Sequence, residues 1–221
     1  EGWYSGWGSS CFPFDAGDVN ILTNGQKLTF VTSIGCGVGN FAASGNNCFG
    51  EAWMEIGDES TPKGACAFIG PSSNTHTAYN NNIDRGIYVG MFDEGLESPG
   101  EALVRGKLYM YEIFGGTDCY VGYLYRIYNV LGDPSLHIWK DTPVNINVSH
   151  TYSVAIGNSQ VSITVIFTGS GLPVANAQVC ISGNGVYAVG STLANGTATI
   201  DIDPQQLGEL DITVYDGKLI P

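Results

Sequence analysis

Basic side chains are scarce in this chain of 221 residues. It has 8 Lys and Arg residues against 21 Asp and Glu residues, so its formal charge is −13, and only 13% of its residues are charged. Such a surface repels nucleic acid and anionic membranes, which excludes both as partners. The acidic excess is spread along the chain, because residues 1–141 carry 7 basic and 16 acidic side chains while residues 142–221 carry 1 and 5.

Long apolar runs are missing as well. No stretch approaches the roughly 20 residues that a membrane-spanning helix needs, so we expect neither a membrane span nor a signal peptide within these residues. The chain begins with Glu1 rather than Met, so we expect it to be a processed or trimmed product.

The residues that are abundant indicate an exported, loop-rich protein. The chain is 43% hydrophobic, with 31 Gly and 12 Tyr, which predicts two modest domains with real cores and substantial β structure. Six cysteines fit an extracellular or cell-surface protein with one or two disulfides, whose pairing the sequence does not give.

One short apolar run leads directly to a cysteine. Leu28–Ile34 has the composition of a strand buried on both faces, and it ends at Gly35-Cys36-Gly37. Ligands bind at the carboxyl ends of strands in open α/β sheets, so Cys36 is a candidate nucleophile. The other interpretation is an inert packed thiol, which is the commoner role of a buried cysteine.

A series of motifs around and after Cys36 resembles the gingipain-type cysteine peptidases, secreted enzymes with a caspase-like fold. The resemblance covers nearly the whole chain, and the order of its parts is more specific than any one of them. The motifs are Ser33–Gly37 with Asn40-Phe41, Cys48–Ala52, Gly64–Gly70 and Tyr128–Leu136.

The resemblance implies a partial α/β caspase-like domain over residues 1–141. Beyond Pro143 the pattern changes to short β-branched runs separated by turns, which predicts an all-β immunoglobulin-like sandwich over residues 142–221. The expected strands of this second domain are 144–148, 152–156, 161–167, 178–181, 186–189, 198–202 and 210–215.

The segment Tyr4–Ser9 departs from the family pattern. The family carries its catalytic histidine between two glycines here, whereas this chain has Trp7. An indole N–H donates only and cannot take a proton from a thiol, so the resemblance implies a defective catalytic base. By the same carry-over, the backbone N–H groups of Cys36 and Gly8 would form the oxyanion hole. A shifted alignment of this segment is the other explanation.

Only three histidines are available to replace the missing base. His76 follows the second predicted core strand, where the family builds a wall of its substrate pocket, so it is the candidate substitute. A surface-loop histidine without a catalytic role is the plainer interpretation. We expect structural or surface roles for His137 and His150.

Residues 80–84, Asn-Asn-Asn-Ile-Asp, are expected to form a polar loop. Its amides and carboxylate could bind a structural calcium ion, although the spacing is not that of an EF-hand; no other cofactor is expected. We expect helices over residues 48–56, from Ser98 onward and over residues 120–131, and a strand over residues 64–70.

Two functions remain open from the sequence. In the first, favoured by Trp7, the chain is a catalytically defective peptidase homologue that serves as an extracellular structural or self-assembling protein, of a filament or surface-layer type. In the second, it is the processed chain of an active cysteine endopeptidase with Cys36 as nucleophile. The family's first catalytic strands and one last sandwich strand have no counterpart here, so we expect open sheet edges. Identical subunits, or the N-terminal part of a precursor, would complete them.

Overall fold

The computed structural model describes residues 2–8, 13–43, 45, 47–140, 142–215 and 219–220. The chain separates into two compact units, Glu1–Ile138 and Trp139–Pro221, each described here by itself. This division falls three residues before the boundary expected between residues 141 and 142. Among the described residues, no helix is both long enough and apolar enough to span a membrane.

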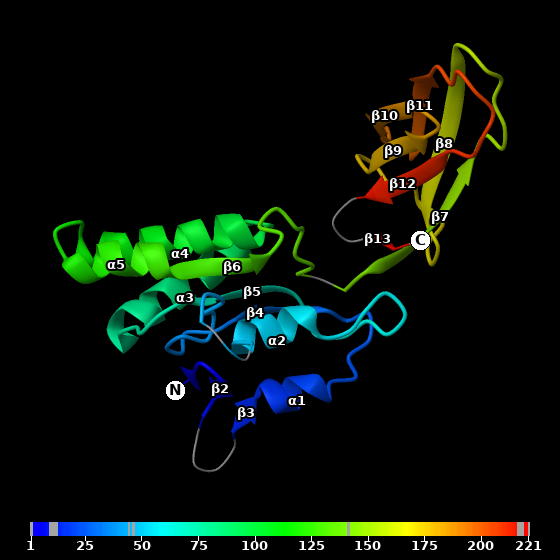
Figure 1. Ribbon diagram of the computed structural model, residues 1–221. Helices are drawn as coiled ribbons and strands as arrows, with labels where there is room; N and C mark the ends of the chain where they lie inside the picture. The colour runs from blue at the N-terminus through cyan, green and yellow to red at the C-terminus, as the bar shows by residue number, and fades with distance from the viewer. Residues whose placement is uncertain are drawn as a thin grey trace. The chain divides into compact units, whose positions relative to one another are not determined.

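The first unit is built on a mixed three-stranded sheet in the order β4-β5-β6, in which β4 runs parallel and β6 antiparallel to the central strand β5 (Figure 1). A small antiparallel sheet, β1-β2-β3, precedes it. The elements are β1 Gly2–Trp3, β2 Gly6–Trp7, β3 Phe14–Asp15, α1 Ala16–Asn20, β4 Thr29–Thr32, α2 Phe49–Glu55, β5 Ala65–Pro71, α3 Thr77–Phe92, α4 Pro99–Phe114, α5 Cys119–Ile127 and β6 Tyr128–Gly132.

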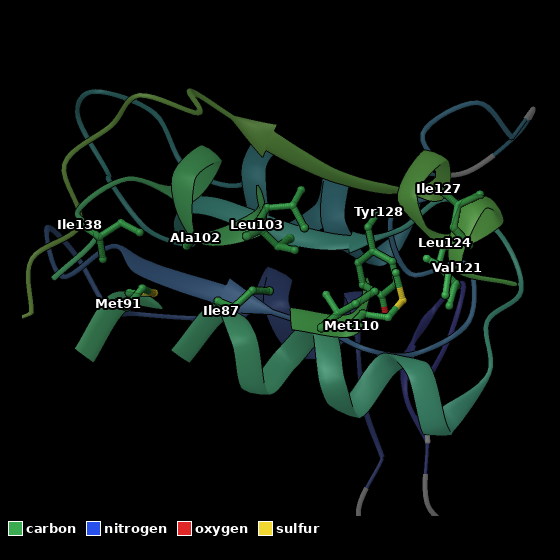
Figure 2. Close-up of a cluster of buried hydrophobic side chains, with 12 residues drawn as sticks. Ile87, Met91, Ala102, Leu103, Met110, Val121, Leu124, Ile127, Tyr128 and Ile138 are labelled. Atoms are coloured by element: carbon green, nitrogen blue, oxygen red, sulfur yellow. The ribbon is translucent and has the colours of Figure 1, made fainter. Parts of the chain in front are cut away.

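Helices cover both faces of this sheet. Successive side chains of a strand point to opposite faces, and apolar side chains of β5 lie on both. Ile69 of β5 packs with α3, α4 and α5, while the neighbouring Phe68 packs with α1 and α2. Figure 2 shows the first of these clusters, in which Met110 and Tyr128 lie beside Leu124. The strand expected before Cys36 is β4, but Leu28 precedes it and is exposed. Val31 is the one buried residue of β4, so the strand is not buried along both faces as expected.

Helices α3 and α4 approach closely through two glycines. A Cβ atom added to Gly86 would lie 2.5 Å from Cβ of Tyr109 and 2.8 Å from Cα of Gly106. Helix α4 begins as expected, with Ser98 as its N-cap accepting from the N–H of Glu101.

Two predicted elements of this unit were wrong. Residues 80–84 form no loop but belong to helix α3, since Ile83 and Ile87 recur one turn apart and are buried. The helix expected to run to Leu131 ends at Ile127, and Tyr128–Gly132 is strand β6, because pairing with β5 satisfies its backbone.

The second unit holds two sheets on one apolar core. Their orders are β11-β8-β7-β13 and β10-β9-β12, and both contribute to the cluster around Ile163 and Ile181. The strands are β7 Val144–His150, β8 Ser159–Phe167, β9 Gln178–Gly183, β10 Val186–Ser191, β11 Thr197–Ile202, β12 Asp211–Tyr215 and β13 Leu219–Ile220. The strand expected over residues 152–156 is absent, while the other six are confirmed; the immunoglobulin-like classification stays a prediction.

The close packing of α3 on α4 predicts opposite effects for two Gly→Ala changes. Gly86→Ala should lower the free energy of unfolding by about 1–3 kcal/mol, because the methyl group overpacks the contact. Gly122→Ala, in the exposed part of α5 where an added Cβ meets nothing within 4 Å, should raise it by about 0.5–1 kcal/mol. Urea unfolding measures both, and equal stabilisation by the two changes would contradict the packing.

Candidate functional site: the cavity beside Cys36

Backbone hydrogen bonds fix the loop that carries Cys36 to the central strand β5 and to the residues that follow it. The N–H of Ser33 donates to the carbonyl of Ile69 over 2.8 Å, and the N–H of Gly37 donates to the carbonyl of Ser73 over 3.0 Å. Gly37 has a φ of +66°, a left-handed conformation that favours glycine, so the chain turns directly after the cysteine. The fixed backbone therefore sets the position of the thiol.

Thr75 contacts the sulfur of Cys36 through its N–H, its hydroxyl and its carbonyl. Its N–H donates to Sγ over 3.4 Å, its Oγ1 lies 3.5 Å from Sγ, and its carbonyl accepts from the thiol over 3.8 Å. Asn80 fixes this arrangement, since its Nδ2 donates to Oγ1 of Thr75 over 2.6 Å and to the carbonyl of Ile34 over 2.9 Å. The partners of the thiol that the structure shows are thus polar and neutral.

Cys36 lies at a cavity of about 560 Å³. Its acidic part comes from α3, where the Asp84 carboxylate accepts from Oγ1 of Thr32 over 3.2 Å, and Oη of Tyr88 lies 2.9 Å from the same hydroxyl. Burial raises the pKa of Asp84, while the Thr32 hydrogen bond opposes the shift. The lining residues are Trp7, Thr32, Ser33, Ile34, Gly35, Cys36, Thr75, Thr77, Asn80, Asp84 and Tyr88.

Two buried polar atoms near this cavity have no hydrogen-bond partner among the described residues. They are Oδ1 of Asn80, whose side chain lines the cavity, and Oη of Tyr128. The two residues are 4% and 1% exposed. Burial, and then the nearby ionisable groups of Asp84 and Cys36, raise the pKa of Tyr128, so its phenol stays protonated. An unpaired acceptor and an unpaired donor are therefore both available here.

Trp7 forms one wall of the cavity. Its indole N–H donates to Oγ of Ser33 over 2.8 Å, and its ring stacks on Phe14 with centroids 5.7 Å apart and meets the edge of Phe49 at 5.1 Å. The side chain is 37% exposed. Both the ring and the N–H of Trp7 are thus engaged in structural contacts.

The structure separates His76 from this cavity. His76 precedes α3 and, with Cys119 and Tyr120, lines a different cavity of about 480 Å³, where its ring contacts Tyr79 at 5.5 Å and Tyr120 at 6.0 Å. Thr75 borders both cavities. The expectation that His76 supplies the base therefore receives no support from the geometry.

The other residues that the sequence singled out lie away from the thiol. Gly8 is exposed after β2 and does not border the cavity, so its role in an oxyanion hole stays a prediction. His137 lies 3.4 Å from the Glu97 carboxylate, and His150 ends β7 in the second unit.

Neither a disulfide nor a metal site occurs in the part of the chain that the structure describes. Five cysteines are free, namely Cys36, Cys48, Cys66, Cys119 and Cys180, so the expected disulfides are absent there; Cys11 lies outside the described residues. No group of three or more His, Cys, Asp or Glu side chains is arranged to hold a metal ion in the same part. The loop proposed for calcium is helical, which removes the reason for that proposal.

Sequence reasoning missed the contributions of Thr75, Asn80, Asp84 and Tyr88 to this site. A usable signal was present, because Asn80, Asp84 and Tyr88 recur every four residues and so share one face of a helix. It was hidden by the interpretation of residues 80–84 as a loop. The contacts of Thr75 are largely made by its backbone and leave no mark in the sequence.

Solved structures define the class of fold. The chain superposes on the Arg-specific cysteine proteinase gingipain R with a TM-score of 0.78 at 21% identity, covering 99% of this chain and 49% of that one. A complex of gingipain pro- and mature domains from Porphyromonas gingivalis gives a TM-score of 0.76 at 21% identity, covering 97% and 49%. The fold is therefore that of a gingipain, with its mixed α/β caspase-like domain.

Sequence comparison then gives the family. The pattern of peptidase family C25 matches residues 2–139, so the chain belongs to that family. It is 26% identical over 212 residues to gingipain R1 of Porphyromonas gingivalis, covering 89% of this chain. The chain spans 19% of that relative's length, and 11% of the length of a gingipain R1 from another strain. The predicted resemblance is thereby confirmed.

The partly buried carboxyl group of Asp84 predicts a pH-dependent stability difference. Because its pKa is raised above the ordinary 3.8, the native state binds a proton more tightly than the unfolded state, and stability falls as pH rises through the interval between these two pKa values. Asp84→Asn has no such loss. The variant should gain stability relative to the parent chain as pH rises from about 3 to 7.

Thermal unfolding midpoints measured across this pH range test the prediction. Glu59→Gln removes a charge from an exposed position of the same unit and should shift stability by no more than about 0.5 kcal/mol at any pH. A pH-independent difference for Asp84→Asn would show that the fold does not raise the pKa of Asp84.

Proposed function

We propose that this chain is a catalytically defective member of peptidase family C25 that serves as an extracellular or cell-surface structural protein, assembling into filaments or a surface layer. The observation that carries the first part is the state of Trp7. Its indole N–H donates to Oγ of Ser33 and its ring packs on Phe14 and Phe49, so this residue forms a fixed wall of the cavity that holds the thiol. That Trp7 replaces the family's histidine is part of the proposal.

The acid–base groups at the cavity support a defective site. Besides Cys36 itself, the titratable side chains that line it are Asp84 and Tyr88, and both share the hydroxyl of Thr32. The polar contacts of Sγ go to Thr75. A general base must lie within hydrogen-bond reach of the proton that it removes, and no imidazole lines this cavity.

The structural role draws on the sheet of the first unit. Strand β4 pairs with β5 on one side, and no strand among the described residues pairs with its other side. An open edge offers N–H and C=O groups to another strand. In this proposal that strand comes from a second copy or from the N-terminal part of a longer precursor. The loop-rich, Gly- and Tyr-rich composition is in keeping with a place outside the cell.

A second candidate function is cysteine endopeptidase activity with Cys36 as nucleophile. It is favoured by one observation, the position of a half-buried thiol on a cavity of about 560 Å³. One solved structure of the same fold is that of an Arg-specific cysteine proteinase. In this case a base would have to come from another part of a longer protein.

A peptidyl electrophile distinguishes the two functions. We expect it to label Cys36 no faster than Cys119, an exposed free thiol of the same chain that serves as an internal reference. Trp7→His should raise the labelling of Cys36 by on the order of 100-fold, since a positioned general base is worth about that much. Peptide mapping by mass spectrometry measures both sites at once.

Cys36→Ala is the control for site assignment in this experiment. Labelling of Cys36 in the unaltered chain that exceeds that of Cys119 by about 100-fold or more would overturn the proposal and favour the endopeptidase. An unchanged rate in Trp7→His would show that position 7 does not hold the place of the base.

A further inference from the structure

Strand β10 is an edge strand of the second unit. In the sheet order β10-β9-β12 it pairs with β9 alone. The turn between them, Asn184-Gly185, has φ values of +48° and +81°, which matches a two-residue hairpin turn with both central residues left-handed. All six residue pairs of the hairpin are in register, so β10 contains no bulge.

The geometry of the hairpin decides which backbone groups of β10 are free. Gly183 and Val186 close the turn as a hydrogen-bonded pair, and hydrogen-bonded pairs alternate along an antiparallel ladder. The N–H and C=O groups of Tyr187, Val189 and Ser191 therefore point away from β9. Within the described residues, no hydrogen bond to these groups is present. The side chains of Tyr187 and Val189 are 77% and 47% exposed.

Proteins protect edge strands with charged side chains, proline or bulges, and β10 has none of these devices. Its sequence, Val-Tyr-Ala-Val-Gly-Ser, is apolar and uncharged. The edge strands β11 and β12 differ, because they carry Asp201 and Asp211. Among these three edges of the second unit, β10 is thus the one open to pairing.

Charge indicates which partner fits this edge. From Thr142 to Ile200 the chain contains no Asp, Glu, Lys or Arg, although its overall charge is −13. A two-fold contact sets two identical strands side by side, so a strand that carries charges of one sign would repel its own copy. A neutral strand avoids that cost and can pair with an identical one.

We propose that β10 pairs antiparallel with β10 of a second copy of this chain, which joins two three-stranded sheets into one of six strands. The two-fold axis places Val189 opposite its own counterpart and Tyr187 opposite the counterpart of Ser191. The three outward-facing residues then exchange N–H···O=C bonds across the axis. This contact is one through which the proposed structural protein would assemble, so the inference rests on the proposed function.

Sedimentation equilibrium of the full chain, over concentrations up to about 1 mM, tests the contact. The weight-average mass should rise from the 23.4 kDa of one chain toward twice that value. Val189→Lys, which sets two ammonium groups against each other, should weaken association more than 10-fold. The matched control Thr213→Lys adds the same charge to the same face, across Cys180 from Val189, and should change association by less than about 2-fold.

Val189→Pro gives a second test that leaves the β9 ladder intact. It removes only an outward-pointing N–H, which an edge strand tolerates, and should also weaken association more than 10-fold. A chain that stays at 23.4 kDa throughout, equal effects of the two Lys variants, or unchanged association of Val189→Pro would each overturn the inference. Electrophile labelling of the same samples keeps the outcomes separate, since fast labelling of Cys36 counts against the defective site and not against this contact.

Discussion

The burial of strand β5 on both faces is the constraint on which the first unit depends. A strand with apolar side chains on both sides is stable only when helices cover both, and here Phe68 and Ile69 face the two helical layers. Beyond the residues of β5 that pair with β4, the carbonyl of Pro71 accepts from the N–H of Gly39 over 3.0 Å, and that of Ser73 accepts from the N–H of Gly37. The loop of Cys36 is thus held by the backbone of the most deeply buried strand.

This support makes the thiol's position independent of any catalytic partner. Trp7 packs in an aromatic cluster with Phe14 and Phe49, and its indole N–H donates to Ser33. These contacts hold the wall of the cavity without any contact to the thiol. A site of this kind can lose its base without losing its shape. A peptidase scaffold can therefore be kept for its surfaces and cavities.

Much of the fold was predictable because periodic apolar patterns and a family resemblance agreed. The strand before Cys36, the helix after Ser98 and most strands of the second unit follow from their sequences. The failures have physical causes. Residues 80–84 are polar like a loop, yet Ile83 and Ile87 anchor them as a helix, and Tyr128–Leu131 continues a helical spacing although its backbone pairs with β5.

The site was predictable only in part. Cys36 and Trp7, which the family resemblance aligned with the nucleophile and the base, border one cavity, while their catalytic roles stay predictions. His76, which lies one residue after Thr75, faces a different cavity, because a change of one position at a helix start turns a side chain to another side.

The most direct test of the defective site is hydrolysis itself. The chain and its Cys36→Ala variant would be incubated with a complex mixture of unfolded proteins, and new peptide termini would be counted by mass spectrometry. The account predicts the same termini, at the same low level, for both. Termini that form with the unaltered chain and vanish with Cys36→Ala would contradict it.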